Sequence, residues 1–200
     1  MRIYPNKKIR KPIHGLYILD IDCSIHNDDI TTRAYNCWRR MINRCHDIKY
    51  QDRCETYKNC SVCEEWFLFS NFFSWFKQNY KQGCELDKDI LVKGNKVYSP
   101  ETCCFVPQEI NKILIKRNKK RGTLPIGVYE QKSGVFLAQI HKNAKTYTIG
   151  TFNNPHSAFL AYKNEKEKYI KEKAKEYFEK GLINENVLIA LTNYIVNIND

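Results

Sequence analysis

The sequence predicts an α+β protein with a helical N-terminal region, a two-strand-and-helix module, and a three-stranded antiparallel sheet packed on a long helix. Between residues 31 and 47, apolar side chains recur at steps of three and four, the period of an amphipathic helix. Residues 86–112 follow the order strand, turn, strand and helix start, and residues 127–150 hold three short alternating runs. Such runs are typical of half-buried strands.

Two helices are expected in the first half of the chain. The apolar face of the first comprises Ala34, Tyr35, Trp38, Met41, Ile42 and Cys45. Its other side carries Arg33, Arg40 and Arg44, which either contact a nucleic-acid backbone or remain solvated. The second helix begins at residue 70 or 71 and ends at residue 80, before a glycine that stops it. We interpret its aromatic residues as core rather than as a platform for stacked bases.

The positive charge of the chain is concentrated in one segment. The 200 residues carry a formal net charge of +11, and residues 112–150 hold nine basic side chains and only one acidic one, Glu130. The basic residues are Lys112, Lys116, Arg117, Lys119, Lys120, Arg121, Lys132, Lys142 and Lys145. Phosphate is the expected partner, because neutralising it releases condensed counterions. A solvated basic linker is the alternative.

The sequence predicts neither a membrane span nor a secretory signal. Its apolar runs, such as Trp66-Phe67-Leu68-Phe69, reach only a few residues, whereas a bilayer requires about 20. Residues 1–12 are basic, but no apolar stretch follows them. The abundance of Lys, Asn, Ile and Tyr is compatible with an AT-rich phage genome or that of its bacterial host. We therefore expect a cytoplasmic protein of a bacterial cell, encoded by the phage or the host.

Nine cysteines in a chain without an export signal favour reduced thiols over a disulfide scaffold. Cys60-x-x-Cys63 has the spacing of half a zinc site, but a closed site needs four ligands. The residues that would have to complete it from a distance are Cys23, Cys54, Cys84 and His46. Ordinary core thiols are the preferred interpretation, and a zinc-organised interaction module is the weaker one.

Alternation in the three C-terminal strands separates an apolar face from a polar one. Phe136, Ala138 and Ile140 share a face, because side chains two apart in a strand point the same way. The opposite face then carries Gln139, His141, Thr146 and Thr148. Asn154-Pro155 predicts the N-cap and first turn of the following helix, whose aromatic residues would cover the apolar face. One side of the sheet is therefore expected to be polar and open.

This segment resembles the DNA-binding domain of the APETALA2/ethylene-response-factor type, which also occurs beside phage and mobile-element nucleases. The matching residues are Gly127, Val128, Gly134, Phe136, Ala138, Gln139, Ile140, Ile149, Gly150, Thr151, Phe152, Ala158, Ala161 and Tyr162. In that family the exposed sheet face enters the major groove of double-stranded DNA. By position, the resemblance assigns this contact to Tyr129, Gln131, Ser133, Gln139, His141, Thr146 and Thr148. Gln pairs with adenine through two hydrogen bonds, which suits groove reading.

Residues 86–111 resemble the ββα-metal core of phage HNH homing-type endonucleases, through Leu86-Asp87-Lys88-Asp89-Ile90, Asn95 and residues 99–107. In that family a strand Asp and a helix Asn or His hold one divalent metal on the scissile phosphate, and an adjacent His activates water. The resemblance implies that Asp87 and Asn111 hold Mg²⁺ or another divalent metal. Lys88 stands where the family has the catalytic His, which alters general-base catalysis.

The resemblance leaves three residues for catalysis. Lys88 would stabilise charge on the phosphate, Asp89 would position a water or contact the metal, and Asn95 would brace the turn. A surface ion-pair turn is the alternative interpretation of Asp87-Lys88-Asp89. In both cases the sequence leads to double-stranded DNA as the partner.

Four segments and two main functions follow. We expect an N-terminal arm over 1–30, an HNH-like ββα module with flanking helices over 31–115, a basic linker over 116–125, and an APETALA2-type DNA-binding domain with a C-terminal helix over 126–200. The backbone contacts are assigned to Arg117, Lys119, Lys120, Arg121, Lys132, Lys142 and Lys145. The first hypothesis is a metal-dependent DNA endonuclease directed by the sheet domain. The second is a non-catalytic DNA-binding protein that regulates or inhibits a nucleic-acid machine.

Overall fold

The computed structural model describes residues 11–21, 30–115, 122–198 and 200, and the chain folds as a mixed α+β protein. It divides into two compact units, Met1–Phe105 and Val106–Asp200. The expected linker over 116–125 therefore falls inside the second unit, and its residues 116–121 lie outside the described residues. Among the helices of the described segments, none combines the length and apolar character needed to cross a membrane.

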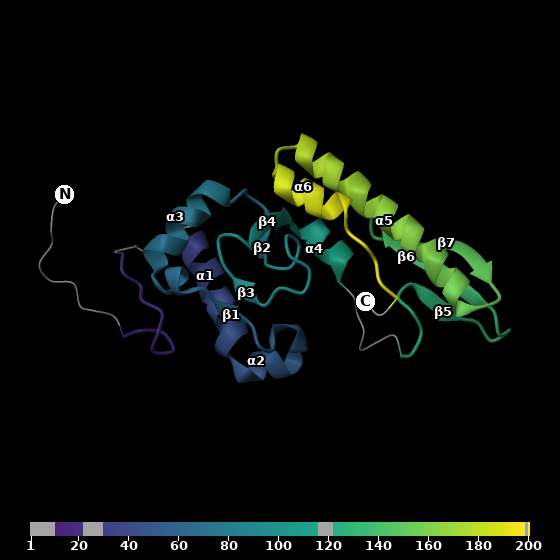
Figure 1. Cartoon of the computed structure of the whole chain (residues 1–200), viewed down its shortest axis with the longest axis horizontal. Helices are drawn as coiled ribbons and strands as arrows, with labels where there is room; N and C mark the ends of the chain where they lie inside the picture. The colour runs from purple at the N-terminus through teal and green to yellow at the C-terminus, as the bar shows by residue number, and fades with distance from the viewer. Residues whose placement is uncertain (1–10, 22–29, 116–121, 199) are drawn as a thin grey trace, which may run out of the picture. The chain divides into compact units, whose positions relative to one another are not determined.

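The described residues of the first unit form three α-helices and four short strands (Figure 1). Its α-helices are α1 (Ile30–His46), α2 (Ile48–Arg53) and α3 (Phe69–Asn79). Its 3-10 helices are η1 (Glu55–Tyr57) and η2 (Glu64–Phe67). Its strands are β1 (Ser61–Val62), β2 (Cys84–Asp87), β3 (Val97–Tyr98) and β4 (Cys104–Pro107), of which β4 continues into the second unit. β1 pairs with β3 in parallel, and β2 pairs with β4.

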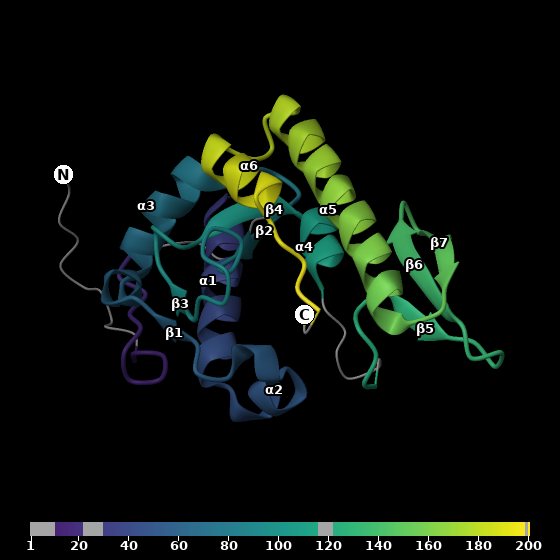
Figure 2. The same cartoon turned by 45° about the vertical axis from the view of Figure 1, so that its right-hand side comes forward.

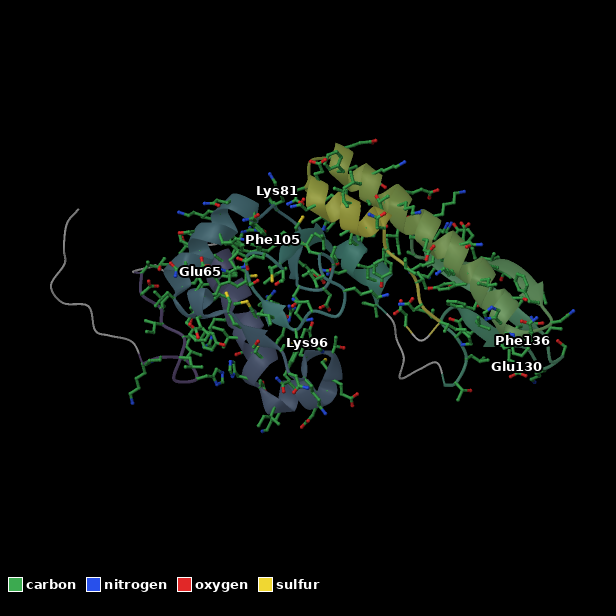
Figure 3. All side chains as sticks on the ribbon, in the orientation of Figure 1. Glu65, Lys81, Lys96, Phe105, Glu130 and Phe136 are labelled. Carbon is green, nitrogen blue, oxygen red and sulfur yellow. The ribbon has the colours of Figure 1, made fainter. Side chains whose placement is uncertain are left out.

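An aromatic core forms where α1 and α3 pack together. The expected apolar positions of α1, Ala34, Trp38, Met41, Ile42 and Cys45, are buried. The Trp38 indole N–H donates to the carbonyl of Trp66 at 2.8 Å, which satisfies the buried polar atom of a large apolar side chain. Phe105 of β4, labelled in Figure 3, meets Phe76 edge-on at 5.2 Å between ring centroids. Phe69, Phe72 and Phe76 of α3 are thus part of the core.

Part of the expected N-terminal arm packs onto this core. Tyr17 is 1 % exposed, and its hydroxyl lies 2.7 Å from Nε2 of His46 at the end of α1. The neighbouring Ile18 forms a parallel bridge with Leu68. Asp20 then accepts the backbone N–H of Ser70 at 2.8 Å. Residues 13–20 are therefore part of the first unit's packing, a role that the sequence did not indicate.

The second unit consists of a short helix, a three-stranded sheet and two further helices. The helices are α4 (Gln108–Leu114), α5 (Pro155–Glu179) and α6 (Glu185–Thr192). The strands are β5 (Val128–Glu130), β6 (Phe136–Lys142) and β7 (Lys145–Phe152). The sheet order is β5-β6-β7 with antiparallel neighbours, which confirms the expected three-stranded antiparallel sheet packed on a long helix.

α5 covers one face of this sheet, as Figure 2 shows. Its N-cap is Asn154, whose side chain accepts the backbone N–H of Ser157 at 2.8 Å. The sheet presents Val128, Ala138 and Ile140, which are buried. The buried residues of α5 are Ala158, Phe159, Tyr162, Tyr169, Ile170 and Ala174.

The close approach of sheet and helix depends on a glycine before β5. Gly127 has φ of +78°, and a Cβ atom there would lie 2.1 Å from Cδ2 of Tyr162. Such a distance is far inside van der Waals contact, so any larger residue would displace the Tyr162 ring. A glycine is therefore required both by the backbone conformation and by the space.

Glu109 of α4 is the acceptor of a cluster that attaches α4 to α5. It accepts hydrogen bonds from the hydroxyls of Tyr169 (3.1 Å) and Tyr177, and it forms an ion pair with Lys173 at 3.2 Å. Although partial burial opposes ionisation, the hydrogen bonds from Tyr177, Lys173 and Tyr169 hold the pKa of Glu109 below its usual value. Burial and the same carboxylate raise the pKa of Tyr177 to about 12.

We expect Glu109→Gln to lower the free energy of unfolding by about 1 kcal/mol at neutral pH, because it weakens the interactions with Lys173 and the tyrosine hydroxyls of a partly exposed cluster. The folded-state pKa of Glu109 is lowered, so this stability is fully present above about pH 4.5 and is lost as the pH falls through the lowered pKa. Thermal unfolding of wild type and variant between pH 7 and pH 3 should show their difference shrinking. A constant difference would contradict this assignment.

Candidate nucleic-acid interface and the loop of residues 87–97

The sheet face turned away from α5 displays exposed polar side chains. We define this outward face by Tyr129, Leu137, Gln139, His141, Thr146, Thr148 and Thr151, which pair across the strands. Gln139 lies opposite Thr148 and His141 opposite Thr146, as the alternation predicted. Most of these side chains are exposed, while Leu137 and Gln139 are half-buried. The surface thus offers hydrogen-bond donors and acceptors to a ligand.

Hydrogen bonds fix two of these cross-strand pairs. Gln139 Nε2 donates to Thr148 Oγ1 at 3.2 Å. Nδ1 of His141 and Oγ1 of Thr146 are also 3.2 Å apart. These bonds restrict the rotation of the two longer side chains, which lowers the entropy cost of binding through them.

The turn between β5 and β6 carries the other expected contacts of this surface. Gln131, Lys132 and Ser133 are exposed in this turn, in which the backbone N–H of Gln131 donates to the carbonyl of Val135 and that of Gly134 donates to the carbonyl of Gln131. Figure 3 marks the strand ends beside it through Glu130 and Phe136, which lie opposite each other. The turn therefore presents a cation and two polar side chains to solvent at the edge of the outward face.

The two lysines of the β6–β7 hairpin occupy different environments. Lys142 forms an ion pair with Glu165 of α5, and its ammonium lies 5.0 Å from the ring centroid of Tyr169. Lys145 pairs with Lys142 in the sheet register but is exposed. Lys142 thus attaches the hairpin to the helix, whereas Lys145 is accessible.

Of the other basic residues expected to contact nucleic acid, four lie outside the described residues and three belong to α1. Arg117, Lys119, Lys120 and Arg121 lie outside the described residues. On α1, Arg44 hydrogen-bonds to Tyr98 and lies 5.1 Å from the ring centroid of Tyr57, so it is committed to the first unit. Arg40 is the exposed member of the three arginines, since Arg33 is half-buried and donates to Tyr80 at 3.4 Å.

The side chain of Asp87, the expected metal ligand, closes a turn at the end of β2. Its Oδ1 accepts the backbone N–H groups of Asp89 and Ile90 at 2.7 and 2.8 Å. Burial raises the pKa of Asp87 despite these two hydrogen bonds. One carboxylate oxygen is therefore already used in holding the backbone of the loop.

Lys88 is buried, with 4 % of its surface exposed. Its ammonium forms an ion pair with Asp89 and donates to the carbonyl of Asn95 at 2.8 Å. The Asn95 amide donates to the carbonyls of Lys88 and Val97 at 2.9 and 2.6 Å. These interactions tie the two ends of the loop together, so Asn95 braces the turn as expected and Lys88 points into the unit.

The residues present do not fit a divalent metal at Asp87. The neighbouring ammonium of Lys88 supplies a positive charge inside the loop, and Oδ1 of Asp87 already accepts two backbone N–H groups. Within the described ranges, no group of three or more His, Cys, Asp or Glu side chains is arranged to hold a metal ion. We therefore derive no step through a metal.

The cysteines of the described segments are free. Cys60 and Cys63 flank the extended residues of β1, and positions three apart in a strand face opposite sides. Cys60 is buried and Cys63 half-buried. Burial raises the pKa of both thiols, which opposes the thiolate form that zinc requires. Cys23 lies outside the described residues.

The sequence reasoning missed Thr151 as a member of the outward face. Strict alternation from Thr148 would place Thr151 on the helix side, but a register shift between Ala138 and Gln139 inserts Ile149 as an extra residue of β7. Thr151 then lies opposite Leu137. The signal in the sequence is Gly150, because a glycine inside a strand often marks a bulge.

No protein-family model, curated protein or solved structure matches this chain.

Proposed function

We propose that the second unit binds double-stranded DNA through the outward face of its sheet. The observation that carries this proposal is the two-sided character of the sheet: α5 covers one face, and the other presents hydrogen-bonding side chains in two cross-strand pairs. The major groove is about 12 Å wide and admits strands. An open polar sheet face suits that groove better than an apolar partner surface.

Charge supports DNA rather than a neutral polar ligand. The chain carries +11, and exposed lysines stand at both ends of the sheet, Lys132 in the turn before β6 and Lys145 in the hairpin after it. Phosphate contacts position a protein on the duplex, and contacts to base edges specify sequence. The lysines at the ends of the sheet suit phosphate contacts. The amide, imidazole and hydroxyl groups between them suit contacts to base edges.

For the first unit we propose a scaffold role without hydrolysis, so that the protein regulates or inhibits a nucleic-acid machine by occupying DNA. A group that acts on a scissile phosphate must reach it. Lys88 instead points into the unit, and the Asp87 carboxylate holds two backbone N–H groups. The burial of Lys88 and the two hydrogen bonds of Asp87 therefore explain both side chains by their role in holding the loop.

A metal-dependent endonuclease is the second candidate. The observation that favours it is the order of elements, since β2 pairs with β4 and α4 follows β4 directly, with the Asp87 carboxylate at the end of β2. In this candidate Mg²⁺ would be the cofactor. The placement of Lys88 weighs against it.

The DNA-binding proposal predicts which lysines contact phosphate. Lys132→Ala and Lys145→Ala should each reduce the slope of log affinity against log salt concentration by about 0.9, the value for one lost phosphate contact. Lys142→Ala is the matched control, because Lys142 is already paired with Glu165, and its slope should equal that of wild type. Fluorescence anisotropy with a labelled duplex between 50 and 200 mM salt measures these slopes. Equal slopes in all four proteins would refute the interface.

The scaffold role predicts that the protein does not cut DNA. Wild type and Asp87→Ala, each incubated with supercoiled plasmid and Mg²⁺ or Mn²⁺, should both leave the plasmid supercoiled, because Lys88 is buried and Asp87 holds the backbone of the loop. Agarose gel electrophoresis resolves nicked and linear products. Metal-dependent cleavage by wild type that disappears in Asp87→Ala would establish the endonuclease instead.

Lys88→Met should lower the free energy of unfolding by about 2 kcal/mol. It leaves Asp89 and the Asn95 carbonyl without their partner, a loss that is smaller than for a fully buried pair because Asp89 is 40 % exposed. Lys81→Met, on an exposed residue of the same unit, is the control and should change stability by less than about 0.5 kcal/mol. Urea unfolding measures both. Equal stability of Lys88→Met and wild type would contradict the structural role of Lys88.

A further inference from the structure

The two hydrogen-bonded pairs of the outward face leave defined groups for a ligand. The amide nitrogen of Gln139 carries two N–H groups, and Thr148 accepts one of them. The other N–H and the amide oxygen form an adjacent donor and acceptor. Adenine presents the complementary pair in the major groove, its N7 acceptor and its N6 amino donor.

The side chain of His141 is likewise held by a hydrogen bond to its own cross-strand neighbour, Thr146. Its Nδ1 is bonded to the hydroxyl of Thr146, so Nε2 is the ring nitrogen left for a ligand. When the hydroxyl donates to Nδ1, the ring proton resides on Nε2, which then acts as a donor. Guanine presents two acceptors, N7 and O6, at the groove edge.

The strand geometry sets the distance between these two readers. Gln139 and His141 are two residues apart on β6 and lie on one face, so their Cα atoms are separated by about 6.7 Å. Successive base pairs of B-DNA rise by about 3.4 Å. Two residues along the strand therefore span about two base steps when β6 follows the groove.

We propose that Gln139 and His141 determine specificity by reading an adenine and a guanine two base steps apart, with Thr148 and Thr146 as the positioning residues that orient them. This inference rests on the proposed DNA-binding function and deepens it. In this proposal Thr148 orients the Gln139 amide and does not itself contact the adenine.

Selection of bound duplexes from a random pool by the full chain tests the base assignment. Wild type should enrich an adenine and a guanine separated by one base pair. In Gln139→Glu the donor N–H is replaced by an acceptor oxygen, which suits the N4 amino group of cytosine. The preference at that one position should change from adenine to cytosine by about tenfold or more, with the guanine position unchanged.

Thr148→Val tests the positioning role, because valine keeps the shape of threonine and removes the hydroxyl. The preference for adenine should fall about threefold to tenfold, whereas affinity for a duplex lacking the site should stay within about twofold. Thr146→Val should affect only the guanine position in the same manner. Thr123→Val is the matched control, since Thr123 is exposed and lies outside the three strands of the sheet, and it should leave both preferences unchanged.

The outcomes separate this inference from the proposed function. Salt-sensitive binding with a flat base profile would overturn the two-base reading and leave DNA binding intact. A base preference that Gln139→Glu and Thr148→Val do not alter would also overturn it. Absence of duplex binding by wild type would overturn both proposals together.

Discussion

The packing of α5 against one face of the β5–β7 sheet decides what the other face presents. Burial of Val128, Ala138 and Ile140 against the helix fixes the phase of each strand, because a slip by one residue would exchange the two faces. With the apolar side committed, alternation places amides, hydroxyls and an imidazole toward solvent. Gly127 permits this packing by leaving room for the ring of Tyr162. The outward face is thus a consequence of the apolar one.

The cations and the directional hydrogen-bonding groups of this sheet occupy different places. Lys142 and Lys145 lie opposite each other in the hairpin, but Glu165 forms its ion pair with Lys142. The exposed lysines, Lys132 and Lys145, lie at the ends of the sheet. The central pairs, Gln139 with Thr148 and His141 with Thr146, consist of groups that carry directional hydrogen bonds. In the proposed complex with DNA, long-range attraction to phosphate would act from the rim, whereas discrimination between bases would act from the centre.

Features set by local periodicity could be predicted from the sequence, whereas those set by tertiary contacts could not. The α1 core positions, the Asn154 cap and the shared face of Gln139 and His141 follow from periods of 3.6 and 2 and from capping chemistry. The position of Thr151 required knowledge of the bulge at Ile149. The environments of Lys142 and Arg44 depend on side chains far away in the sequence. The sequence pattern therefore did not distinguish these two residues from exposed lysines and arginines. The packing of Tyr17 has the same origin, since its partner His46 is 29 residues away.

In the loop of residues 87–97, Lys88 determines both how the loop is held and whether a general base stands at this position. A buried ammonium is tolerated only with acceptors around it, and Asp89 and the Asn95 carbonyl provide them. A histidine at position 88 would be shorter and would not carry a fixed charge at neutral pH, so it could not hold the loop by the same ion pair. The residue that removes the expected general base therefore also supplies the loop with its internal cation. The shape of this loop therefore rests on contacts among its own residues, the Lys88–Asp89 ion pair and the hydrogen bonds of Asp87 and Asn95.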